Sequence, residues 1–513
     1  MSEWIWCYSD RLSARPGESV TLHISATGGT CDIEIARLGK KRDVVFTESG
    51  IKTGQHDVPV NAHVHGCGWP QTHRITTGDW KSGYYEILLK AADGAICRHM
   101  LCVKAAKPAA KAVVVLSTNT YHAYNSWGGA NTYAWVGGPH PAPLPTDPAE
   151  HAIAARLSLE RPFSAGLMQP VSPRHRLVNE RRRGFRERAL AGEVAHEAKA
   201  GGNGWDCPSG FTDKWEHAFV QWAEENGVEL DYLTDYDLEA ERDALDGYKA
   251  ALFVGHSEYW SRGEREEAER FVDAGGRAII LSGNTCYWQC RFEDGGRTFV
   301  AFKGRAEEED PYMTDPAKRH LTSGLWSAPW TGAPEAQLTG LSFLFGGYHR
   351  FGLCTARGIG GYTVWREDHW ALKDADLYWG DVFGDECRLV GYENDGCPLT
   401  FGEDGLPRPV ARLGVPENLE IIATAPATLS EPESPYGGVV PPEAWGPLTR
   451  AFASFDSPAN RARMMRGHAV MASFRRGKGE VFNSGTTEWA YGLQARNPFV
   501  EQITKNVLAR FLG

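Results

Sequence analysis

Polar side chains follow three apolar runs of the sequence, at the points where buried strands are expected to end. The segment TNTYHAYNSWGGANTYAW follows AVVVLS, HSEYWS follows ALFVG, and GNTCYW follows RAIILS. In an open α/β sheet, ligands bind beyond the carboxyl ends of the strands. Glu258 and Asn284 are 26 residues apart, which is one strand-to-strand step through one helix. We therefore expect these two side chains to lie at the same edge of a parallel sheet.

These residue types could serve metal or acid–base chemistry, but each also has an ordinary structural explanation. Tyr124 and Tyr133 lie on either side of Gly128–Gly129, a pair that permits a sharp turn and would let the two rings face one another. Aromatic packing around the loop is the commoner explanation for tyrosines. A carboxylate such as Glu258 in a Trp/Tyr-rich loop is costly unless it is paired, hydrogen-bonded or bound to a metal ion. A carboxylate near the N-terminus of the following helix is the alternative.

The elements that would position these residues change in character along the chain. Residues 1–106 contain short runs of period two separated by Gly, Asp and Pro, which predict a β-sandwich. Residues 111–284 alternate apolar runs with helical patterns, and 478–513 restore a strand and a final amphipathic helix. These two stretches predict one α/β domain with a mostly parallel sheet. Residues 285–477 are rich in Gly and Trp, with β-like pieces such as GYTVWR and RLVGYE, and we expect a large insertion covering the cleft.

One helix can be bounded from the sequence alone. Ser261 is a plausible N-cap, and Glu264 three residues later completes a capping box. Gly275 and Gly276 would end the helix after Ala274. This helix connects the strand before Glu258 with the strand before Asn284.

Composition and charge restrict the class of protein. The chain has 513 residues, a net charge of −11 and 42% hydrophobic residues, which indicates a globular protein and argues against binding to nucleic acid or an anionic membrane. No apolar stretch is long enough to cross a membrane, and no signal peptide is expected at the N-terminus. Eleven cysteines without a CxxC pair favour reduced thiols and a cytoplasmic location.

Several motifs of residues 111–513 resemble one enzyme family, the N,N-dimethylformamidase large (beta) subunit family in its C-terminal catalytic region. The motifs that carry the resemblance are YHAYNSWGG, GHSEYW, SGNTCYW, GGYHRFG, GYENDG and NSGTTEWAYGL. The resemblance implies a hydrolase that cleaves the C–N bond of small linear amides and releases an amine and a carboxylate. We expect a β-sandwich followed by a flavodoxin-like or class I glutamine-amidotransferase-like domain. A small partner subunit and a homo-oligomer stay open.

The resemblance also implies a mononuclear iron site held by two tyrosines and one glutamate. Tyr124 and Glu258 match the first tyrosine and the glutamate, and Tyr133 is taken as the second tyrosine. Two phenolates and a carboxylate are three hard anionic oxygens, which suit Fe³⁺ better than zinc.

Three further residues match positions that act on the substrate in this family. Glu393 of GYENDG matches a carboxylate that would take the proton of the attacking water. His256 and Asn284 match residues that line the site, and either could donate a hydrogen bond to the developing oxyanion.

Two rival functions are compatible with the sequence. Cys286 lies just past a strand end and could be the nucleophile of a cysteine hydrolase, although no G-x-C-x-G elbow surrounds it. Alternatively, the chain could be a non-catalytic ligand- or carbohydrate-binding protein whose tryptophans form a platform, namely Trp127, Trp135, Trp260 and Trp288.

Overall fold

The computed structural model describes residues 4–92, 94–125, 127–132, 154–168, 210–212, 215–349, 360–429, 458 and 466–513. The chain divides into two compact units. The first contains the described residues within Met1–Val171, Ala189–Asp237 and Phe292–Val300, and the second contains those within Leu238–Arg291 and Ala301–Gly513. Strands and helices alternate in a mixed α/β chain that is richer in strands.

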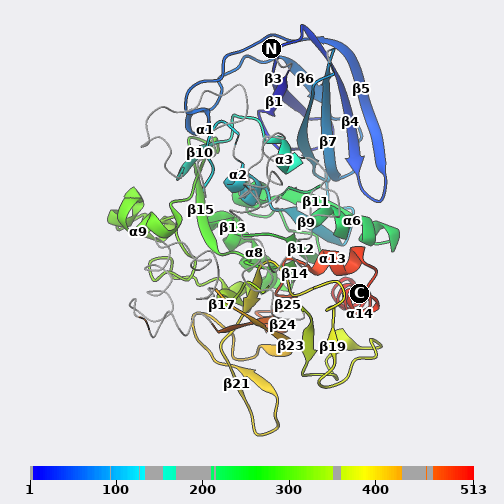
Figure 1. Ribbon diagram of the computed structural model, residues 1–513, viewed down its shortest axis with the longest axis vertical. Coiled ribbons are helices and arrows are strands. Elements are labelled where there is room, and N and C mark those ends of the chain that lie inside the picture. Colours follow the sequence, from blue (N-terminus) through cyan, green and yellow to red (C-terminus); the bar gives the residue numbers. More distant parts are fainter. Residues whose placement is uncertain are drawn as a thin grey trace, which may run out of the picture. The chain divides into compact units, whose positions relative to one another are not determined.

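The N-terminal part of the first unit consists of two antiparallel-dominated sheets around one core (Figure 1). One sheet has the order β1 Ile5–Ser9, β3 Ser19–Ala26, β6 His73–Thr76. The other has the order β2 Ser13–Ala14, β8 Ile96–Val103, β7 Gly83–Ala91, β4 Thr30–Leu38, β5 Arg42–Lys52. Leu22 of β3, Ile35 of β4 and Ile87 of β7 belong to the same buried cluster. Alternate residues therefore point into one shared core, as the period-two pattern predicts.

The rest of the first unit begins with a strand buried along its whole length. This strand, β9 Ala112–Leu116, pairs in parallel with β11 Leu230–Thr234. A second, antiparallel pair joins β10 Arg156–Ser158 to β16 Thr298–Val300. The helices are α1 Ala62–His65, α2 Thr118–Tyr124, α3 Ala165–Met168 and α6 Glu216–Glu225, while α7 Asp235–Ala240 lies at the boundary of the units.

The sheet of the second unit combines parallel and antiparallel strands. Its order is β12 Ala250–Gly255, β14 Arg277–Ser282, β25 Gly479–Asn483, β24 Gly467–Arg476, β23 Glu420–Ala427, β18 Tyr362–Val364, β19 Val382–Phe383. The first three strands are parallel, and each later neighbour is antiparallel. Residues 285–477 thus supply four strands to this sheet, in addition to loops. The piece RLVGYE forms no strand, because Arg388 has a φ of 54° and Leu389 N–H turns back to the Gly384 carbonyl.

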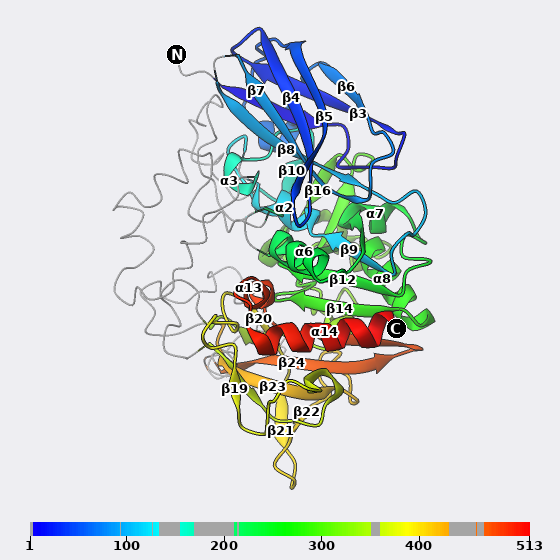
Figure 2. The same ribbon diagram turned by 90° about the vertical axis from the view of Figure 1, so that its right-hand side faces the viewer.

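Two helices pack along this sheet (Figure 2). Helix α8 Arg262–Ala274 has the predicted capping box, since the Ser261 hydroxyl accepts from Glu264 N–H and the Glu264 side chain accepts from Ser261 N–H. Helix α14 Pro498–Leu512 begins after the N-cap Asn497. Its Arg510 bonds Glu480 of β25 at 3.0 Å, which fixes the helix to the sheet.

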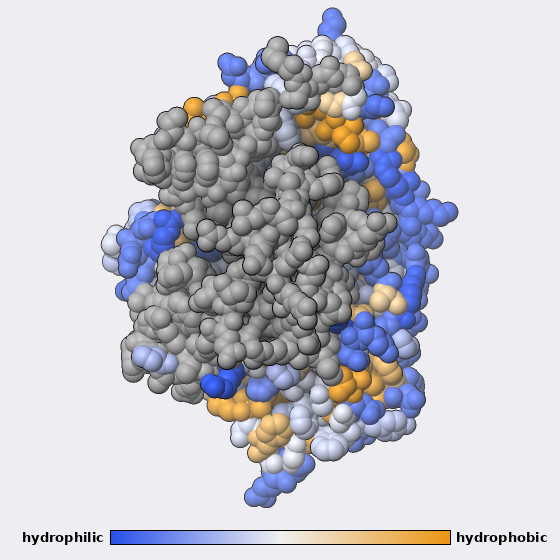
Figure 3. Space-filling model, in the orientation of Figure 1, coloured by the Kyte–Doolittle hydropathy of each residue, from blue (hydrophilic) through white to orange (hydrophobic). Residues whose placement is uncertain are grey.

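Shorter elements complete the second unit. They are β13 Tyr259–Ser261, η3 Lys303–Arg305, α9 Ala306–Glu309, η4 Pro311–Thr314, η5 Arg319–Leu321, α10 Ala336–Thr339, β17 Ser342–Gly347, η6 Trp370–Leu372, β20 Asn394–Gly396, β21 Leu399–Phe401, β22 Pro407–Pro409 and α13 Trp489–Gln494. Strand β15 Trp288–Glu293 begins in the second unit and ends in the first. Hydrophobic side chains reach the surface near β19 and β21 (Figure 3), among them Val382, Phe401 and Val410. None of the helices in the described ranges is long and apolar enough to cross a membrane.

Candidate active site

Two loops at the carboxyl end of the parallel strands carry three of the expected site residues. Strands β12 and β14 are parallel neighbours, with Gly255 opposite Ser282. His256 and Glu258 therefore leave the sheet at the same edge as Asn284. The two loops are joined by backbone bonds, because Cys286 N–H donates to the Ser257 carbonyl at 2.8 Å.

Glu393 reaches this edge from a distant part of the sequence. It precedes β20, which pairs with β17, and its carbonyl accepts from Thr487 N–H at 3.1 Å. A Cβ atom at Gly283 would overlap with the Glu393 carbonyl oxygen and would lie 2.7 Å from Thr487 N. Glycine at 283 is therefore needed to let the segment of Glu393 lie directly against the loop that follows β14.

His256, Glu258 and Glu393 form a compact buried cluster. The His256 Nε2 atom lies 2.6 Å from Glu393 Oε2 and 3.3 Å from Glu258 Oε2. All three side chains are at most 3% exposed. One imidazole, even when protonated, cannot balance two ionised carboxylates. Because buried charge is costly unless it is compensated, the cluster favours an additional cation or a shared proton.

A continuous series of aromatic rings flanks this cluster. Its successive ring pairs are Trp288–Tyr287 at 4.8 Å, Tyr287–Phe343 at 5.2 Å, Phe343–Tyr348 at 5.2 Å, Tyr348–Tyr392 at 6.1 Å and Tyr392–His256 at 5.8 Å. Burial, followed by the nearby Glu393 and Glu258 carboxylates, raises the pKa of Tyr348 well above its usual value. These rings exclude water from one side of the carboxylates, which strengthens electrostatic interactions among them.

Sequence reasoning did not identify Tyr348 or Asp395 as part of the site. Tyr348 shares a hydrogen bond with the Glu393 side chain, and Asp395 accepts from Thr285 N–H, beside Asn284, at 3.1 Å. The motif GYENDG could have indicated Asp395, because it lies two residues after Glu393. In an extended segment, side chains two residues apart point to the same face. For Tyr348, no local pattern distinguishes it from other buried tyrosines.

The two expected tyrosine ligands have different outcomes. Tyr124 lies at the end of α2 in the first unit and is 3% exposed, whereas Glu258 belongs to the second unit. Tyr133 lies outside the described residues. The participation of both tyrosines in an iron site therefore stays a prediction.

The donor types present can be compared with the requirements of a metal ion. Within the described ranges, no group of three or more His, Cys, Asp or Glu side chains has a metal-binding arrangement. The iron site expected from the family resemblance would not be such a group, because two of its three ligands would be tyrosine oxygens and only the third would be the carboxylate of Glu258. Glu258 fits such a set, because it is a hard oxygen donor and shares its buried surroundings with the second carboxylate of Glu393.

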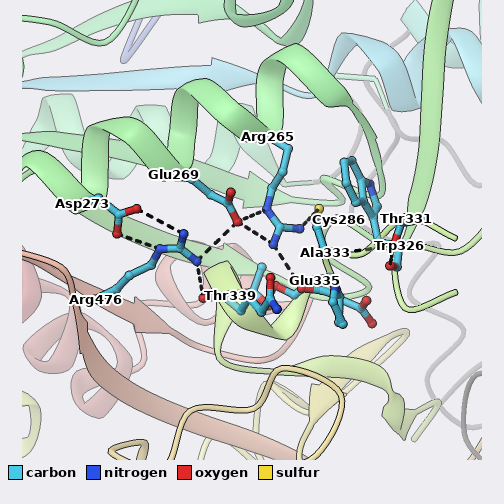
Figure 4. Close-up of polar contacts among 12 residues, drawn as sticks. Arg265, Glu269, Asp273, Cys286, Trp326, Thr331, Ala333, Glu335, Thr339 and Arg476 are labelled. Atoms are coloured by element: carbon cyan, nitrogen blue, oxygen red, sulfur yellow. Dashed lines mark hydrogen bonds and ion pairs between the residues drawn. The ribbon is translucent and has the colours of Figure 1, made fainter. Parts of the chain in front are cut away.

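Cys286 is unsuited to nucleophilic catalysis. Its side chain is fully buried, and Arg265 Nη1 lies 3.4 Å from Sγ (Figure 4). Burial raises the pKa of Cys286, and this effect exceeds the opposing influence of Arg265. The residue is therefore a thiol rather than a reactive thiolate. Arg265 also donates to Glu269 at 2.8 Å and to the Pro334 carbonyl at 3.1 Å. Its contacts therefore link helix α8 to the segments of Cys286 and Pro334.

The expected tryptophan platform is wrong for the three described residues. Trp127 and Trp260 are fully buried, and Trp288 is 6% exposed. Trp127 packs against other tryptophan rings in the first unit, and Trp260 packs against Phe253 at 4.7 Å. These indoles fill cores and offer no face to a sugar. Trp135 lies outside the described residues.

Comparison with known proteins gives one extensive match. A family model described as "N,N-dimethylformamidase beta subunit-like, C-terminal" matches residues 32–504. No curated protein matches the chain. A cycloisomaltooligosaccharide glucanotransferase of Paenibacillus sp., complexed with cycloisomaltoheptaose, is 20% identical over 21% of this chain and 15% of its own, with a TM-score of 0.14. A superoxide reductase (neelaredoxin) from Ignicoccus hospitalis is 7% identical over 20% of this chain and 80% of its own, with a TM-score of 0.13.

Proposed function

The chain belongs to the N,N-dimethylformamidase beta subunit-like family, and from this premise we propose that it is a metal-dependent hydrolase of small linear amides. The reaction adds water to the carbonyl carbon, breaks the C–N bond and releases an amine and a carboxylate. The observation that carries the proposal is the buried cluster in which His256 Nε2 faces both Glu258 and Glu393.

Glu258, Tyr124 and Tyr133 are the residues that would hold the metal ion, which we propose to be a single Fe³⁺. When bound, this ion would polarise the amide carbonyl and make a water molecule more acidic. Glu258 belongs to the buried cluster described above. Its neighbour Glu393 leaves a second negative charge there, which a cation would balance.

Glu393 is the proposed general base. Its carboxylate would accept a proton from the attacking water and deliver it to the nitrogen of the departing amine. His256 Nε2 lies 2.6 Å from Oε2 of this carboxylate, so we assign the histidine to orienting Glu393. The carboxamide of Asn284 is then the better candidate for a hydrogen bond to the oxygen on which charge develops.

The proposal also covers the fold of the α/β part, the location of the enzyme and its subunits. A flavodoxin-like or class I glutamine-amidotransferase-like architecture for the α/β part, behind the N-terminal β-sandwich, stays part of it. We also propose a cytoplasmic enzyme. A small partner subunit agrees with the family's designation as a beta subunit, and a homo-oligomer is a further possibility to be tested by measuring the mass of the particle in solution.

The test combines metal content with turnover. Purified protein should contain one iron per chain and show a visible phenolate-to-iron absorption band, and it should release amine from N,N-dimethylformamide or a related small amide. Glu258→Ala should lose the iron, the band and the activity together. The exposed control Glu417→Ala should keep all three. Wild-type iron occupancy in Glu258→Ala would reject its role as a ligand, and full turnover by metal-free protein would reject the metal dependence.

A further inference from the structure

The turn that carries Asn284 has an unfavourable backbone conformation. Asn284 and Cys286 both have positive φ angles, of 52° and 53°. Residues with a Cβ atom rarely adopt this left-handed region, and it persists only where the surroundings enforce it. The turn therefore needs contacts that hold it, and the position of the Asn284 side chain depends on them.

Asp395 supplies such a contact from a rigid element. Its Oδ2 atom accepts the Thr285 N–H at 3.1 Å. Burial raises the pKa of Asp395 to about 7, whereas the neighbouring N–H groups of Thr285 and Asn284 lower it. Asp395 is fully buried in β20, and its own N–H donates to the Gly485 carbonyl at 3.0 Å. The carboxyl group is thus fixed in space and faces the middle of the strained turn.

The carboxamide oxygen of the side chain held by this turn is unsatisfied. The Asn284 side chain is 2% exposed, and its Oδ1 atom has no hydrogen-bond partner in the described part of the chain. A buried carboxamide oxygen without a partner is costly, unless it accepts a hydrogen bond from a ligand. The turn thus presents a carboxamide at the sheet edge that also carries His256 and Glu258, and Asp395 holds this turn through Thr285.

We infer that Asp395 is a positioning residue, which holds the turn Gly283–Cys286 so that the carboxamide N–H of Asn284 can donate a hydrogen bond to the carbonyl oxygen of the substrate while its Oδ1 atom accepts one from the attacking water. This inference rests on the proposed amidase function. Asp395 itself would touch neither water nor substrate. What it contributes is an acceptor oxygen for the turn, and an asparagine at 395 can supply that oxygen equally well.

The kinetic test compares Asp395→Ala and Asp395→Asn with Asn284→Ala. Because loss of one oxyanion donor typically costs about 10²–10³-fold in kcat, a misplaced Asn284 should lower kcat about 10- to 100-fold, with KM within about twofold. Asp395→Asn should recover most of the rate. In the Asn284→Ala background, Asp395→Ala should cause no further loss beyond about twofold, because residues that act as a unit are not additive. Losses that multiply, or an unchanged rate in Asp395→Ala, would overturn the inference.

A matched control and a second readout separate this inference from the proposed function. Asp310 also anchors a buried loop, through Ser323 N–H at 2.8 Å and Tyr312 N–H at 3.0 Å, and in addition pairs with Arg291. Asp310→Ala should lower stability without the kinetic pattern. Amide hydrogen exchange of residues 283–288 should accelerate in Asp395→Ala but not in Asp310→Ala. This second result is expected even if the wild-type chain hydrolyses no amide, and unchanged exchange would refute the anchoring role.

Discussion

Replacing Glu393 by glutamine tests the proposed general base with little disturbance of the fold. The backbone of Glu393 is bonded to Thr487 on both sides, since Thr487 N–H donates to its carbonyl at 3.1 Å and its own N–H donates to Thr487 Oγ1 at 3.3 Å. Neither bond involves the carboxylate. Glutamine has nearly the same volume, so the substitution removes the proton acceptor and leaves the anchoring intact.

The expected magnitude follows from what the carboxylate contacts. Oε2 lies 2.6 Å from His256 Nε2 in a buried cluster, a position in which a base is well oriented. General acid–base groups contribute typically about 10²–10⁴-fold, which corresponds to about 3–5 kcal/mol of the barrier. We expect kcat to fall by this factor. Stability should change by less than about 2 kcal/mol, because losing the ion pair with His256 is offset by removing one of two neighbouring buried charges.

The assay measures initial rates of amine release from N,N-dimethylformamide between pH 6 and 9, together with iron content and thermal unfolding. The control is Glu335→Gln, which removes another buried carboxylate, one bonded to the Ser342 hydroxyl rather than facing His256. It should keep the rate within about threefold. A Glu393→Gln protein with full iron content and a rate close to wild type would show that the base is another group.

Two further predictions concern stability. Burial raises the pKa of Glu335 to about 7, so the folded state keeps this proton up to a higher pH than the unfolded state, and stability falls as pH rises from about 4.5 to 7. The unfolding free energy of Glu335→Gln should not fall in this way, so its advantage over wild type should grow by about 3 kcal/mol as the pH is raised from 5 to 8. Urea titration at each pH measures this difference. The exposed Glu417→Gln should show no such gain. Ser261→Ala should cost about 1 kcal/mol through loss of the helix cap, and Ser261→Thr should not; equal losses in both variants would contradict the capping argument.

Local patterns were sufficient for the elements whose signals lie within one segment. The helix after Ser261 was bounded correctly because its capping box and its final glycine are both local features. The strands at 112–116, 250–255 and 277–282 are continuous apolar runs buried on both faces. Since parallel neighbours align their ends, the common edge of His256, Glu258 and Asn284 could be predicted as well.

Long-range pairing could not be predicted in the same way. β24 pairs antiparallel with both β23 and β25, and nothing in its sequence names these neighbours. The position of Glu393 could be inferred only from the family resemblance, because it depends on the pairing of β20 with β17 and on close backbone contact at Gly283. The role of Asp395 could not be predicted either, since the strained turn that it holds is visible only in three dimensions.

The close contact at Gly283 determines which positions near the site can be substituted. Main-chain atoms from three remote stretches meet there, around the Glu393 carbonyl and the Thr487 nitrogen, so the spacing between them is set by peptide groups that every amino acid shares. The rings of Phe343 and Tyr392, by contrast, differ from residue to residue in shape and can be exchanged one at a time. We therefore expect variants that accept bulkier or more polar substrates to carry substitutions at Phe343 or Tyr392. Position 283, by contrast, should tolerate only glycine.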